Sequence, residues 1–174
     1  MEDLRYPIGK FSIPEKLGAP ELELAVESIE KFPTRLKKLV QDLTADQLDT
    51  PYRPGGWSVR QLVHHCADSH MNAFMRFRWA LTEDKPTIKP YDQTEWAKLP
   101  DSKMDIHPSV FIIEGVHQRW TYLLNNISRD DFEKEFIHPE HSGSTPLYAA
   151  TAMYAWHCNH HLAHISTLIE REDW

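Results

Sequence analysis

The sequence has few of the features that mark secreted, membrane-spanning or nucleic-acid-binding proteins. It contains two cysteines, Cys66 and Cys158, which are too few for a disulfide framework. No apolar run approaches the ~20 residues of a membrane helix, and the N-terminal segment contains no apolar signal core. The net charge of −7 argues against a partner held through phosphate contacts. We therefore expect a cytoplasmic protein with neither a membrane nor a nucleic-acid partner.

Length and composition predict one domain. The chain has 174 residues, 41% of them apolar, and contains neither an internal repeat nor a low-complexity tract. Residues 1–174 are therefore expected to form a single domain around one core. Pro7, Gly9, Pro14 and Gly18 indicate that the chain starts with an extended arm, residues 1–18.

Apolar residues recur at helical spacing in four long segments. The predicted helices cover about residues 20–43, 58–82, 108–127 and 145–170. Pro33 lies inside the first segment and is expected to break or kink it. Ser58, with Gln61 three residues later, forms a capping-box sequence at the start of the second segment. Four principal helices with long connecting loops predict an all-α four-helix bundle.

The connections between these helices are expected to differ. Residues 44–48, T-A-D-Q-L, predict a short capped turn. Residues 83–107 are rich in proline and charge, with a short helix expected near residues 94–98. Residues 129–144 are expected to be a polar connection, so the bundle contains at least one long crossover.

Histidine is the one residue type present in unusual number, with eleven copies, four of them in the stretch W-H-C-N-H-H-L-A-H, residues 156–164. An α-helix turns by about 100° per residue, so His161 lies about 40° from His157 on the last helix, and both fall inside or beside its apolar stripe. His164 lies at about 340°. His160, at about 300°, lies off the edge of the stripe.

On the second predicted helix, the same calculation selects His65, which borders the apolar stripe, whereas His64 points about 100° away. If the two stripes face each other, His65 meets His157 and His161 across the interior. Three imidazole ligands are typical of catalytic zinc sites, because they leave a fourth position for water. Imidazole also suits nickel. The pattern predicts one divalent ion per subunit, zinc or nickel, bound by these three histidines.

The residues also leave alternatives open. His160 and His164 are one turn apart and form a rival ligand pair. A lone interior histidine is more often a hydrogen-bonded core residue than a ligand. Asp68, one turn after His65, is a candidate catalytic base or a partner that orients a ligand N–H, or else a solvated or helix-pairing carboxylate.

Other side chains with reactive groups are interpreted as structural. Cys66 and Cys158 each follow a predicted ligand but point about 100° away from it, which favours small buried fillers over thiolate ligands. Tyr154 is interpreted as a core residue, with donation to a substrate oxyanion as the alternative. The remaining histidines are interpreted as surface or loop residues without a role: His70, His117, His138 and His141.

Two stretches of the chain are distinctive: Y-R-P-G-G-W-S-V-R-Q-L-V-H-H-C-A-D-S-H-M-N and W-H-C-N-H-H-L-A-H-I. They resemble the DinB superfamily, and specifically its YfiT-like metal-dependent hydrolases. R-Y-P-I-G, L-D-T-P-Y-R and K-P-Y-D-Q-T-E-W also match, so the resemblance covers nearly the whole chain. It implies a four-helix bundle of DinB/YfiT type, a homodimer, and zinc or nickel held by His65, His157 and His161. His164 stands where the superfamily usually has glutamine, which keeps it as an alternative ligand or a catalytic proton carrier.

The pattern and the resemblance lead to three hypotheses. The first is a metal-dependent hydrolase acting on a small-molecule substrate, with Asp68 or His164 moving a proton. The second is a metal-dependent S-transferase, in which the ion activates a low-molecular-weight thiol such as bacillithiol. The third is a metal-stabilised binding or stress-response module without catalytic activity.

Overall fold

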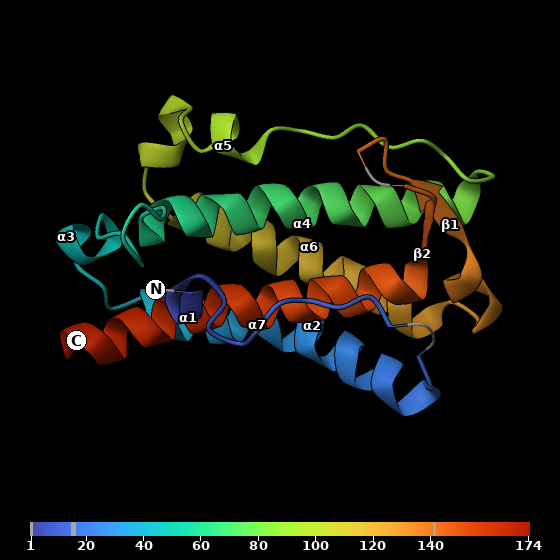
Figure 1. Ribbon diagram of the computed structural model, residues 1–174, viewed down its shortest axis with the longest axis horizontal. Helices are drawn as coiled ribbons and strands as arrows, with labels where there is room; N and C mark the ends of the chain where they lie inside the picture. Colours follow the sequence, from blue (N-terminus) through green and yellow to red (C-terminus); the bar gives the residue numbers. More distant parts are fainter. Residues whose placement is uncertain (1, 15–16, 141) are drawn as a thin grey trace.

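The structure, a computed structural model, describes residues 2–14, 17–140 and 142–174 and is built on four long helices (Figure 1). They are α2 (Ala19–Val40), α4 (Val59–Thr82), α6 (His107–Asn126) and α7 (Leu147–Glu172). Both α2 and α4 pack against α6 and α7. The predicted all-α four-helix bundle with long connecting loops is therefore confirmed, and whether residues 1–174 are a single domain stays a prediction.

Side-chain caps explain where three of the helices begin, two of them with a capping box. The Ser58 hydroxyl accepts the backbone N–H of Gln61, whose side chain accepts the backbone N–H of Ser58, so α4 starts with the predicted capping box. Thr44 and Gln47 form the same reciprocal pair at the start of α3 (Ala45–Leu48). The remaining short elements are α1 (Glu2–Arg5), α5 (Gln93–Trp96) and two 3₁₀ turns, Pro100–Lys103 and Asp130–Glu133.

Helix α2 continues through Pro33, so of the break or kink expected at this residue the break is wrong. A proline inside a helix removes the hydrogen bond to the carbonyl four residues earlier. Phe32 and Leu36, on either side of Pro33, are fully buried in the core. This packing holds the helical path, since most helix stability in proteins comes from burying one face. The carbonyl left free by Pro33 belongs to Ile29.

A two-stranded antiparallel sheet was not expected in the connection between α6 and α7. Strand β1 (Glu135–Ile137) pairs with β2 (Ser144–Pro146), and Phe136 lies opposite Thr145. The side chain of Phe136 is buried in the core. One inward aromatic residue thus anchors a hairpin that is too short to show a period-two pattern in the sequence.

The N-terminal arm lies along α7. It contains the short helix α1, which corrects the expectation of a wholly extended arm. The indole N–H of Trp156 donates to the carbonyl oxygen of Gly9, at 3.2 Å, and the ring of Phe11 lies 5.9 Å from the ring of Trp156. Figure 1 shows the arm crossing in front of α7. The arm therefore covers part of a helix face that would otherwise be exposed.

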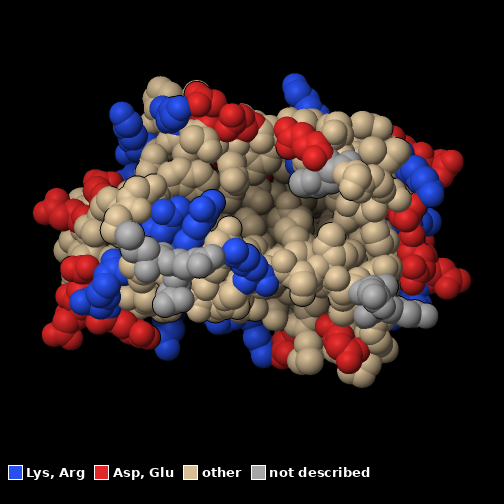
Figure 2. All heavy atoms as spheres, in the orientation of Figure 1, with Lys and Arg blue, Asp and Glu red and all other residues tan. Residues whose placement is uncertain are grey.

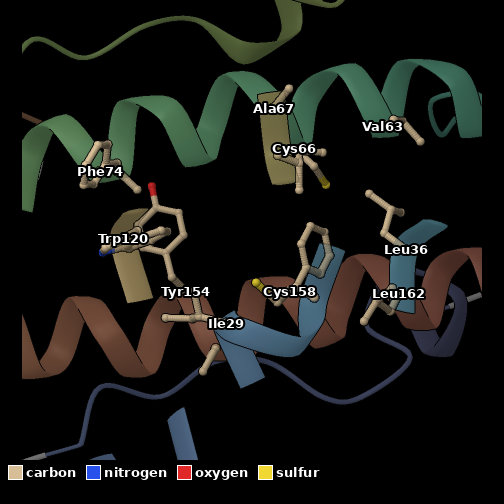
Figure 3. Packing of buried hydrophobic residues seen from close by; sticks show 14 of the residues in the cluster. Ile29, Leu36, Val63, Cys66, Ala67, Phe74, Trp120, Tyr154, Cys158 and Leu162 are labelled. Carbon is tan, nitrogen blue, oxygen red and sulfur yellow. The ribbon is translucent and has the colours of Figure 1, made fainter. Parts of the chain in front are cut away.

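The core between the helices is aromatic at one end and aliphatic at the other. Figure 3 shows Trp120 beside Tyr154, with ring centroids 5.3 Å apart, and Leu36 near Leu162 further along. Cys66 reaches into the same core from α4, and Cys158 from α7. Among the described residues, every helix is too short or too polar to cross a membrane.

Candidate metal centre

Three imidazoles converge between α4 and α7. His65 projects from α4, and His157 and His161 project from consecutive turns of α7. The Nε2 atom of His157 lies 3.4 Å from Nε2 of His65 and 3.1 Å from Nε2 of His161. Trp57, in the loop before α4, packs its ring 4.8 Å from that of His65. The helix phases thus predicted correctly that these three side chains share one face of the interior.

The three nitrogens match the donor set and spacing that a zinc or nickel ion requires. Ligands about 2.0–2.1 Å from a tetrahedral zinc ion lie about 3.3 Å from one another, close to the two N···N distances here. Burial lowers the pKa of His65 to about 4 and the pKa values of His157 and His161 well below the usual range. The rings are therefore neutral near pH 7, as ligands must be.

Two further histidines extend inward from His157. Its Nδ1 atom lies 3.1 Å from Nε2 of His70, and Nδ1 of His70 lies 2.7 Å from Nε2 of His117. His70 and His117 are 0% and 1% exposed, so their interpretation as surface or loop residues is wrong. Burial lowers the pKa of His117 to about 4 and that of His70 well below its ordinary value, which keeps both rings neutral.

The inner end of this chain is fixed by a backbone carbonyl. Nδ1 of His117 lies 2.6 Å from the carbonyl oxygen of Ile29, the oxygen that Pro33 leaves without a helical partner. A carbonyl oxygen can only accept, so His117 donates from Nδ1 and accepts at Nε2. The proline thus creates the acceptor that sets the orientation of His117.

The direction of each hydrogen bond between His117, His70 and His157 follows from that acceptor. His70 must donate from Nδ1 to His117, and it then accepts at Nε2 from Nδ1–H of His157. A neutral His157 with its proton on Nδ1 presents the lone pair of Nε2 to His65 and His161. The buried chain therefore selects the ring tautomer of His157 that can bind a metal ion.

A second group could in principle hold an ion, because the donor atoms of His70, His117 and Cys158 also lie within 4.8 Å of one another. An ion on Nδ1 of His70 would leave the proton on Nε2, which points at His157. His157 would then carry its own proton on Nε2 and lose its ligand atom. Since the two arrangements exclude each other, we assign His70 and His117 to the hydrogen-bonded chain.

Comparison with known proteins identifies the family. A model of the DinB superfamily matches residues 28–165. The chain belongs to the DinB superfamily. Proteins named "Putative metal-dependent hydrolase" from Bacillus cereus (strain 03BB102) and Bacillus anthracis (strain A0248) are 50% and 49% identical over 174 residues, all of both chains. YfiT from Bacillus subtilis, described as a probable metal-dependent hydrolase with an unusual four-helix bundle topology, superposes with a TM-score of 0.96 at 43% identity over 99% of each chain.

In this DinB-superfamily chain, His160 and His164 form a separate pair. Their Nε2 atoms lie 3.0 Å apart, and both residues are buried. His160, off the edge of the apolar stripe, is buried by stacking on Trp156 and by Tyr6 of the arm, and His164 packs on Tyr52. In the part of the chain that the structure describes, no third histidine, cysteine or carboxylate completes a metal-binding group with this pair.

The remaining candidates differ in burial and in the pKa of their side chains. Asp68 is half-buried, and burial, with a smaller contribution from Asp101, raises its pKa to about 6. Cys66 and Cys158 are fully buried, and burial raises the pKa of both thiols, as suits structural fillers. His141 lies outside the described residues.

The helix phase on α4 could have identified His70, one of the two buried histidines that the sequence analysis assigned to the surface or to loops. His70 lies about 140° from His65, so it borders the apolar stripe of α4 on the side opposite to His65. The phase that selected His65 applies equally to His70. For His117 the indication in the sequence was weaker. Its role depends on a hydrogen bond to the free carbonyl of Ile29, which is far away in the sequence.

Proposed function

We propose that the protein is a metal-dependent hydrolase in which His65, His157 and His161 hold one divalent ion, zinc or nickel. The convergence of their three Nε2 atoms carries this proposal. A cavity of about 480 Å³ reaches His157, a volume that suits a small-molecule ligand. Figure 2 shows the face between α4 and α7 hollowed near its centre. The names of the relatives at 50% and 49% identity support the same activity.

Each residue in the proposed mechanism has a distinct task. When bound, the ion supplies a Lewis acid that polarises a substrate oxygen and lowers the pKa of water towards about 7. The chain through His70 keeps the lone pair of His157 aimed at the shared position. Asp68 is the proposed proton acceptor, because it lies half-buried on α4 one turn after His65, and its carboxyl, with a pKa of about 6, is ionised yet still basic near neutral pH. His164, already paired with His160, is the less suitable alternative.

Metal analysis of variants tests the site. His157→Ala should lower the zinc and nickel content of the purified protein at least tenfold, whereas His160→Ala should leave it unchanged. Equal metal content in the two variants would overturn the ligand assignment. With metal content intact, Asp68→Asn should lower the kcat for a hydrolysed ester by about 10²-fold or more, and an unchanged kcat would remove Asp68 from the mechanism.

Spectra of the cobalt-substituted protein separate hydrolysis from the other two hypotheses. If bacillithiol, glutathione or cysteine changes the cobalt spectrum and is consumed together with an electrophile, thiol transfer replaces hydrolysis as the function. A spectrum with four protein ligands and no exchangeable position would favour a binding module. The predicted homodimer is tested alongside by light scattering of the metal-loaded protein.

A further inference from the structure

The cavity that reaches His157 has an unusual wall. It lies between α4, α7 and the segment that contains α5, and Arg76, Tyr91 and Tyr154 line it together with His157. Ser69 and Met153 complete the part of the wall that belongs to α4 and α7. A ligand in this cavity would therefore contact His157, one of the three proposed metal ligands, and an arginine at the same time.

Arg76 is the feature that distinguishes this wall. Arg76 is only 9% exposed, and among the described residues no carboxylate forms an ion pair with its guanidinium. Its polar neighbour is the hydroxyl of Tyr154, which is neutral. Arg60, on the same helix, shows the usual arrangement, with its Nε 2.6 Å from Oδ1 of Asp49. A guanidinium stays charged in proteins, and a buried charge without a counter-ion is costly.

The two acidic residues that line the cavity do not neutralise the positive charge of Arg76. Oδ1 of Asp92 accepts the backbone N–H groups of Thr94 and Glu95, at 2.8 and 3.1 Å, and so caps α5. Glu140, also on the wall, is exposed to solvent. Since neither carboxylate pairs with Arg76, an anionic ligand would match a guanidinium to which the described residues supply no counter-ion.

We propose that Arg76 binds an oxyanion group of the substrate, a carboxylate or a phosphate, and so positions the reacting bond beside the centre at His157. This inference rests on the proposed hydrolase function and adds the class of substrate. A guanidinium donates two parallel hydrogen bonds to such a group, which fixes orientation as well as position. The hydroxyls of Tyr91 and Tyr154, on the same wall, are further donors within the cavity.

Anion binding to the metal-free protein tests the pocket without any catalysis. Inorganic phosphate and propionate are titrated separately while the Nε–H signal of Arg76 is followed by NMR. The signal should shift with at least one of the two, and the anion that binds more tightly identifies the group. Arg76→Gln should raise that dissociation constant at least tenfold. Arg78→Gln, an exposed control two residues along α4, should leave it unchanged. No shift with either anion, or equal binding by Arg76→Gln, would overturn the proposal.

Ester hydrolysis by the zinc-loaded protein provides the second measurement. The substrates are a matched pair of aryl esters, one with a free carboxylate on the acyl chain and one without. Arg76→Gln should raise KM at least tenfold for the charged ester and change it less than twofold for the neutral one, and equal effects on both would contradict the role of Arg76. If neither ester is hydrolysed, the hydrolase proposal fails, while the anion titration still decides whether Arg76 forms a binding site.

Discussion

The hydrogen bond between His157 and His70 permits the most quantitative test of the site. His70→Phe keeps a ring of similar size on α4 but removes the acceptor, 3.1 Å away, of the Nδ1–H of His157. The proton of His157 is then free to move to Nε2, the atom that faces the metal position. Losing such an outer hydrogen bond lowers metal affinity about 10–100-fold, or about 1.4–2.8 kcal/mol.

His117→Phe should have a smaller effect of the same sign. It leaves the bond between His157 and His70 in place but removes the acceptor that keeps the proton of His70 on Nδ1. If the two tautomers of His70 become equally populated, half of the molecules present the lone pair of His157 to the metal. The apparent zinc affinity then falls about twofold.

Zinc competition with a chromophoric chelator at fixed pH measures both effects, and ¹⁵N shifts of the His157 ring report its tautomer. The matched control is His64→Phe. His64 is also buried on α4, but it bonds to the Ser109 hydroxyl, at 2.7 Å, and takes no part in the hydrogen bonds that lead to His157. It should lose a similar amount of stability and keep its zinc affinity. If His70→Phe binds zinc as tightly as His64→Phe, the hydrogen bond from His157 to His70 does not control the affinity for the metal.

Two further predictions follow from the same chain. The pKa of His117 is about 4 in the folded protein against an ordinary 6.5, so the folded state binds fewer protons between these values. The unfolding free energy of the metal-free protein should therefore fall as pH decreases from 6.5 to 4, and this residue should account for about 3 kcal/mol of the loss. Urea titrations at several pH values should show that the unfolding free energy of His117→Phe depends less steeply on pH. The same pH dependence in both proteins would contradict this. Pro33→Ala restores a backbone N–H that competes with His117 for the Ile29 carbonyl. The stability gained from Pro33→Ala should therefore be about 1 kcal/mol larger in the His117→Phe variant than in the unmodified protein. Equal gains in the two proteins would mean that this N–H and the His117 ring do not share the oxygen.

Helix periodicity was sufficient to predict the fold and the three converging imidazoles. His157 and His161 are one turn apart, so their shared direction is a property of the helix and needs no tertiary information. His65 required one assumption, that the apolar stripes of α4 and α7 face each other. A bundle almost guarantees this, because those stripes have to be buried against something.

The missed features depend on contacts between segments far apart in the chain. His160 lies off the apolar stripe of α7 but is buried all the same, because Trp156 and Tyr6 pack against its ring. The pairing of β1 with β2 is likewise a contact between segments, held by the burial of Phe136. Periodicity along one segment contains no information about such partners.

Pro33 shows how a violated local rule can be explained by the site. A proline in a helix interior costs about 3 kcal/mol relative to alanine, and the sequence therefore predicted a break or a kink. The structure uses the missing N–H to leave one carbonyl free, and α2, α6, α4 and α7 each contribute one member of the chain from Ile29 to His157. The orientation of the His157 ring on α7 is thus set by Pro33 on α2 through three successive hydrogen bonds. It follows that substitutions at Pro33 or His117, which look like core changes, should alter metal affinity as well as stability.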